Sequence, residues 1–168
     1  MDQPETPGKC KMPTPVTSAS VRLKAMDLLA RREYSRYQLS DKLTSKLALG
    51  AEHLDILAAV LDRLIADDLL SDERFAATLV RSKLHKGQGP WRIAHELQKS
   101  GVSAELQSRA LVECGVDWYE LAAAVASKKY GSRPAEDISE KARRSRFLQS
   151  RGFSSEHIAH ALSLGNDG

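Results

Sequence analysis

The segment LQKSGVSAE at residues 97–105 recurs as LQSRGFSSE at residues 148–156, an offset of 51 positions. The pair Ala110-Leu111 recurs at the same offset as Ala161-Leu162, so that seven of the fifteen compared positions are identical. Each copy combines a helix end, a glycine that can turn the chain, an apolar residue to bury and a serine that can cap the next helix. The repeat therefore predicts a helix–turn–helix element that occurs at least twice.

A looser third copy lies upstream. Lys42-Leu43 corresponds to Glu96-Leu97 and Val60-Leu61 to Ala110-Leu111, with a connection that is four residues longer. A period of about 50 residues is typical of repeat arrays, in which one unit buries little apolar surface and neighbours stack. We therefore expect an elongated array of three tandem three-helix repeats, of either curvature, at residues 21–70, 71–116 and 117–165.

Composition supports an all-α fold. Leu and Ala together supply 43 residues, whereas the β-branched Val and Ile supply 13. Good helix formers therefore outnumber strand formers. Apolar residues recur at helical spacing in several segments, and Ser35 with Gln38 three residues later predicts a capping box at a helix start.

The two ends of the chain differ from the middle. Residues 1–20 carry four of the six prolines without apolar periodicity and predict a disordered leader, and residues 166–168 a frayed tail. We find no signal peptide and no apolar run near the ~18 residues of a membrane span. The two cysteines have neither metal nor redox spacing. These features predict a cytoplasmic protein without membrane contact, metal or cofactor.

Basic residues gather at two places, although the formal net charge of +3 is too small to indicate nucleic acid by itself. One cluster surrounds a glycine-rich turn, and we place the other at the corresponding position one repeat later. We interpret the clusters jointly as a contact surface for an acidic or phosphate-bearing partner; for any single residue a solvated face is an equal alternative. Their members are Arg81, Lys83, Lys86 and Arg92, then Arg143, Arg144, Arg146 and Arg151.

The glycines are interpreted as turns. Gly87, Gly89 and Pro90 suggest a phosphate-binding loop, but the spacing is wrong and no Lys-Ser or Lys-Thr pair follows. A helix end, a turn and a proline-led helix start explain them better, with helix-start amides offered to a partner's anion as the alternative. Gly101 and Gly152 each follow a helix and predict left-handed turns.

Histidine and tryptophan give no site. His157 and His160 lie three residues apart without a convincing third metal ligand, so we interpret them as a solvated pair. Trp91 and Trp118 are interpreted as packing residues, with Trp118 sealing a joint between units. No nucleophile signature accompanies any histidine. The chain is therefore not expected to be an enzyme.

Several motifs, in order and spacing, resemble the RecX family of regulators of bacterial recombination. The resemblance covers residues 21–164. It implies three tandem three-helix modules that bind the RecA filament along its groove and restrain filament growth, ATP hydrolysis and strand exchange. The sequence departs from the family in Gln88, where an aromatic residue is frequent, and in a long polar loop at residues 45–52. The motifs are ARREYS (30–35), LSDERF (70–75), KGQGPWRI (86–93), KYG (129–131) and RFLQSRGF (146–153).

A DNA-binding helical module is the alternative, because three-helix units can resemble helix-turn-helix domains. Gln98, Lys99, Gln149 and Arg151 could reach bases, but they stand at helix ends next to the glycines. We therefore expect any contact with single-stranded DNA to be weak, non-specific and directed at phosphates. We expect a monomer.

Overall fold

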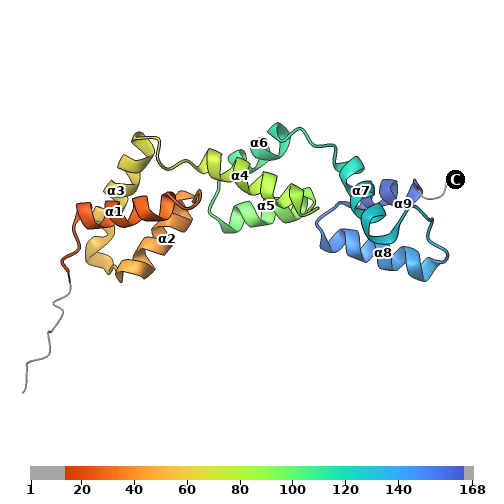
Figure 1. Cartoon of the computed structure of the whole chain (residues 1–168), viewed down its shortest axis with the longest axis horizontal. Helices are drawn as coiled ribbons and strands as arrows, with labels where there is room; N and C mark the ends of the chain where they lie inside the picture. The colour runs from red at the N-terminus through yellow and green to blue at the C-terminus, as the bar shows by residue number, and fades with distance from the viewer. Residues whose placement is uncertain (1–13, 165–168) are drawn as a thin grey trace, which may run out of the picture.

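The computed structural model describes residues 14–164, which form nine α-helices and one 3-10 turn and contain no strand. Three groups of three helices follow one another along the long axis of the molecule (Figure 1). The prediction of an all-α, elongated array of three-helix repeats is confirmed. The helices are α1 (Ser18–Leu29), α2 (Arg36–Leu47), α3 (Leu54–Ala66), α4 (Asp72–His85), α5 (Pro90–Lys99), α6 (Ala104–Glu113), α7 (Trp118–Tyr130), α8 (Ile138–Ser150) and α9 (Ser155–Ser163), with the 3-10 turn η1 (Ala51–His53) before α3.

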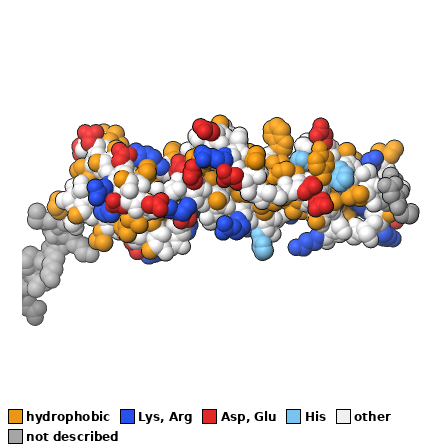
Figure 2. Space-filling view, turned by 90° about the horizontal axis from the view of Figure 1, so that it is seen from above, with side chains coloured by type: hydrophobic (Ala, Val, Ile, Leu, Met, Phe, Trp, Pro, Cys, Tyr) orange, Lys and Arg blue, Asp and Glu red, His pale blue; other side chains and the backbone are white. Residues whose placement is uncertain are grey.

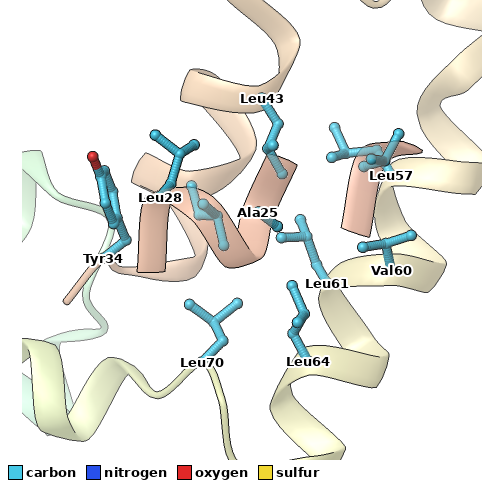
Figure 3. Close-up of a cluster of buried hydrophobic side chains, with 11 residues drawn as sticks. Ala25, Leu28, Tyr34, Leu43, Leu57, Val60, Leu61, Leu64 and Leu70 are labelled. Carbon is cyan, nitrogen blue, oxygen red and sulfur yellow. The ribbon is translucent and has the colours of Figure 1, made fainter. Parts of the chain in front are cut away.

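Each unit has a hydrophobic core of its own. In the first unit, α1 to α3, side chains from all three helices converge on Ala25 of α1 (Figure 3). The second unit, α4 to α6, and the third, α7 to α9, bury separate clusters. Leu43, Leu97 and Leu148 stand at equivalent repeat positions in the middle helices α2, α5 and α8, and each is 0% exposed. The repeat in the sequence is therefore a repeat of core positions.

The first helix begins earlier than expected. The side chain of Thr17 accepts a hydrogen bond from the Ser20 amide (3.1 Å) and caps α1, and Val16 packs against the first core. Helix α1 therefore starts at Ser18, inside the segment 1–20 that the sequence assigns to a disordered leader. Residues 1–13 of that leader and the predicted tail at 166–168 lie outside the described residues.

The first and second units meet where the start of α2 lies on the end of α5, a contact we call the first joint. The buried Ser35 hydroxyl donates to the Ser100 carbonyl (2.5 Å), and the Gln38 side-chain amide donates to the Ser100 hydroxyl (3.0 Å). The Ser35 hydroxyl also accepts a hydrogen bond from the backbone amide of Gln38 (3.1 Å). Only half of the predicted capping box is present, because the Gln38 side chain contacts the neighbouring unit.

The second and third units meet in the same way, where the start of α5 lies on the end of α8; we call this the second joint. The Gly89 amide donates to the Arg151 carbonyl (2.7 Å), and the Trp91 amide donates to the Gly152 carbonyl (3.0 Å). The first amides of one helix thereby satisfy the last carbonyls of another, with the opposite ends of two helix dipoles in contact.

Two glycines make this close contact possible. Gly101 (φ +75°) and Gly152 (φ +94°) are left-handed turns after α5 and α8. A Cβ atom on Gly101 would lie 2.4 Å from Tyr37 Cβ, and one on Gly152 would lie 2.5 Å from the Arg92 amide nitrogen. The equivalent turn after α2 is made by Ala48 (φ 50°), which is exposed. Glycine is thus found at the two turns that receive another unit.

We expect alanine at Gly101 or Gly152 to destabilise the protein more than alanine at Gly115. All three residues have positive φ, which costs roughly 1–2 kcal/mol for a residue with a Cβ. No heavy atom lies within 4 Å of the Cβ position at Gly115. A Cβ atom at Gly101 or Gly152 would instead displace the start of the helix that packs on that turn. Urea unfolding should show an additional loss of at least ~1 kcal/mol for Gly101→Ala and Gly152→Ala. Equal losses for all three variants would show that the joints do not depend on close contact.

Candidate cationic interface at the second joint

The two predicted basic clusters come together at the second joint. Lys86 caps the end of α4, Arg92 lies in the first turn of α5, and Arg151 caps the end of α8. The Arg151 guanidinium donates to the Lys86 carbonyl (3.0 Å), which links the third unit to the second. The clusters are adjacent because the helix ends meet. With the offset of 51 residues, Arg92 and Arg143 occupy equivalent repeat positions and the other members do not.

Three of the eight predicted residues are already engaged in polar contacts between helices. The Arg92 guanidinium donates to the Ser150 carbonyl (2.9 Å), and Arg151 is held on Lys86 as described. Lys83 Nζ lies 3.7 Å from Glu96 Oε2, and its side chain is largely buried. These residues stabilise the arrangement of α4, α5 and α8, so their charges are only partly open to a partner.

Arg144, which was predicted as part of a basic contact surface, is buried instead. It is only 8% exposed, and its guanidinium donates to Glu140 Oε1 (2.6 Å) and to the Arg133 carbonyl (2.8 Å). The register of the repeat contains the signal for this burial, because an offset of 51 places Arg144 where the second unit has the buried Ile93. Arg144 therefore holds the loop between α7 and α8 against α8.

The remaining four predicted residues are exposed, and one of them, Arg81, lies apart from the other three. Arg143 and Arg146, three residues apart, lie on one exposed face of α8. Lys86 is exposed at the end of α4. Arg81 instead lines a groove between α4 and α6.

Two residues outside the predicted clusters, Lys129 and Phe147, also contribute here. Lys129 Nζ of α7 lies 4.5 Å from the centre of the Phe147 ring, and the Arg151 guanidinium carbon lies 5.2 Å from it. Both cations are thus held by the ring face of Phe147. The Phe147–Arg151 spacing of four residues on a helix could have indicated their contact, whereas Lys129 comes from another helix.

We define the cationic surface as Lys86, Lys129, Arg143, Arg146 and Arg151. It follows α8 for about 12 Å from Arg143 to Arg151. Among residues 14–164, Arg143 alone of these five pairs with a carboxylate, at a long 3.8 Å from Glu140. Acidic side chains also lie near Arg143 and Arg146, because Glu136, Asp137 and Glu140 line the same hollow. Over the first and second units, basic and acidic side chains are interspersed (Figure 2). Four of the five basic side chains of this surface thus have no carboxylate partner in the described residues, as is also the case for Lys42 and Lys46 of α2.

Trp118 lies as expected, whereas Trp91 and the two histidines do not. Trp118 of α7 packs against the core of the second unit, across the joint, whereas Trp91 is 68% exposed and its interpretation as a packing residue was wrong. His157 and His160 are partly buried, with ring centres 4.8 and 5.4 Å from that of Tyr119. They are not a solvated pair.

Two classes of site have no counterpart in the described part of the chain. Residues 14–164 contain no group of three or more His, Cys, Asp or Glu side chains that could hold a metal ion. None of their helices is long and apolar enough to cross a membrane. The structure thus offers surfaces between helices as its candidate sites.

These features define an all-α tandem-repeat protein whose units stack end to end and present a cationic surface at one joint. Residues 71–111 match the family model described as RecX, second three-helix domain, and residues 116–162 match RecX, third three-helix domain. The chain belongs to the RecX family.

Individual relatives agree with this assignment. The chain is 43% identical over 145 residues to Regulatory protein RecX of Chromohalobacter salexigens, covering 86% of this chain and 92% of the relative. It is 40% identical over 147 residues to Regulatory protein RecX of Pseudomonas syringae pv. tomato, covering 88% and 92%. The crystal structure of RecX from Lactobacillus salivarius has the same fold, with a TM-score of 0.74 at 21% identity, covering 89% of this chain and 96% of that chain.

We expect Arg144→Ala to destabilise the protein and Arg143→Ala to leave its stability nearly unchanged. The buried Arg144 makes charge-assisted hydrogen bonds whose loss costs about 2 kcal/mol, whereas the Arg143 side chain is 64% exposed. Thermal unfolding of the two single variants compares the same residue type at neighbouring positions. A midpoint for Arg144→Ala equal to that of Arg143→Ala would contradict the assigned role.

Glu140 should make stability fall in acid. The pKa of its carboxyl group is lowered because it accepts hydrogen bonds from the Glu136 amide and from Arg144. A lowered folded-state pKa stabilises the protein above the ordinary value of about 4.3. That contribution is lost as the pH falls through the folded-state value. Urea unfolding between about pH 6 and pH 3 should show a weaker decline for Glu140→Gln than for wild type. Parallel profiles for wild type and Glu140→Gln would show that Glu140 does not contribute to the loss of stability in acid.

Proposed function

We propose that this chain binds the RecA recombinase filament and restrains its growth, ATP hydrolysis and strand exchange, without catalysing a reaction itself. The observation that carries the proposal is the membership of a family whose relatives are named regulatory proteins, in a chain with no catalytic motif. The RecX resemblance supplies RecA as the partner. Because RecA acts on chromosomal DNA, the proposal places this protein in the cytoplasm.

The shape of the molecule suits such a partner. A linear stack of three units can lie along a groove of a polymer and contact several of its subunits (Figure 1). Stacked repeats present extended surfaces of this kind, each unit adding contact area. One chain could therefore bridge neighbouring filament subunits and oppose their movement, without a pocket for any one of them.

The cationic surface supplies the electrostatic part of the proposed contact. A filament on DNA offers carboxylates on its protein and phosphates on its nucleic acid. Unpaired cations opposite such groups raise the association rate and the affinity in a salt-dependent manner. Arg143 and Arg146 serve this purpose best, because both are exposed on α8 and neither is part of a joint.

The test is RecA ATPase activity on single-stranded DNA, titrated with this protein. We expect wild type to inhibit and the double variant Arg143→Ala/Arg146→Ala to need at least about threefold more protein, most clearly at moderate salt. Its melting temperature should stay close to wild type, because exposed charges contribute little to stability.

The matched control is Lys42→Ala/Lys46→Ala, which removes two exposed charges from α2, the middle helix of the first unit. It should inhibit as wild type does. If wild type has no effect on RecA, the proposed function is wrong. If both double variants inhibit equally across a salt series, the cationic surface is not the contact.

A further inference from the structure

Trp91 occupies an unusual position for a large aromatic residue. Its backbone amide is fixed on the Gly152 carbonyl (3.0 Å), yet 68% of the residue is exposed. Aromatic side chains of this size usually bury most of their surface. The ring stands beside a hollow of about 440 Å³ between α5 and the end of α8. A hydrogen-bonded backbone thus holds an exposed indole at the edge of an open surface hollow.

The lining of this hollow identifies the kind of ligand. Apart from Trp91, every side chain that lines it is polar, among them Arg92, His95, Lys99 and Gln149. Its one carboxylate, Glu96, lies 3.7 Å from Lys83 Nζ. An apolar side chain from a partner protein would have no apolar residue to pack against opposite the indole. An aromatic ring that carries an anionic group could stack on the indole and pair with the cations.

The spacing along α5 strengthens this assignment. Trp91, His95 and Lys99 follow one another at intervals of four residues and therefore lie on one face of the helix. The rise of an α-helix places the Lys99 backbone about 12 Å from that of Trp91. A stacking ring with cations farther along the same groove is the arrangement by which proteins hold single-stranded nucleic acids.

We propose that the hollow binds single-stranded nucleic acid, with one base stacked on the Trp91 indole and the adjoining phosphates on Lys99 and on the free donors of Arg92. The binding is independent of sequence, because every base has a face that can stack. It is also independent of RecA, so that it does not rest on the proposed function.

The test follows the fluorescence of Trp91 in the variant Trp118→Phe, which has no other tryptophan. Adding oligothymidylate should quench the emission to saturation, and higher salt should weaken the binding. If Trp118→Phe perturbs the fold, the affinity can be measured instead with the wild-type chain, from the fluorescence anisotropy of a labelled oligothymidylate.

In the anisotropy assay, Trp91→Ala should weaken binding at least about fivefold, since stacking of a base is worth ~1–3 kcal/mol, whereas Trp91→Phe should retain most of the affinity. Lys99→Ala should weaken binding and lower its salt dependence. Tyr37→Ala is the matched control. Tyr37 is exposed at the same helix position of the first joint, where the neighbouring Arg36 pairs with Asp62; this variant should bind as wild type does.

Two results would overturn the proposal. Equal affinity of Trp91→Ala and wild type for oligothymidylate would show that no base stacks on the Trp91 indole. Quenching that appears only when RecA is added would identify Trp91 as an anchor for a protein. Neither result depends on the ATPase titration of Arg143→Ala/Arg146→Ala, so the two proposals can fail separately.

Discussion

The contact of one helix start with the final turn of another determines the rest of this structure. In both joints a middle helix begins on the glycine turn that ends the middle helix of the next unit, as in the 2.7 Å bond from the Gly89 amide to the Arg151 carbonyl. Polar backbone groups that a helix leaves unsatisfied are paired across the joint, and the dipoles of α2, α5 and α8 point the same way along the array. Three small cores, each marginal alone, are thereby combined into one linear molecule.

This mode of stacking also determines which surfaces are available. Because the units touch through helix ends, the middle helices keep one side open along their length. The second joint consequently has two different flanks. On one of them the Lys129 and Arg151 cations both lie over the Phe147 ring. On the other, Trp91 stands beside a polar hollow. Both flanks depend on the Gly152 turn, since moving α8 away from α5 would separate their contributing residues.

The sequence predicted the fold well because the repeat records core positions and turns. Leu97 and Leu148 are buried, and Gly101 and Gly152 have positive φ, in agreement with their shared motif. The candidate site was predicted less well, because basic residues were grouped by proximity along the chain. The repeat register would have placed Arg144 at a core position. Lys129, by contrast, reaches the surface from a separate helix, and the exposure of Trp91 depends on how two units meet. Neither can be obtained from spacing within one segment.

Ala48 has a consequence for the size of the assembly. Head-to-tail contacts that do not close into a ring can in principle add copies without limit. The exposed turn after α2 is the position where another chain would have to attach its α8, but the methyl group of Ala48 stands where Gly101 and Gly152 leave room for an incoming helix. Adding another chain through the contact that joins the units would therefore bring its helix against the Ala48 methyl group, whereas the two joints within the chain meet a glycine.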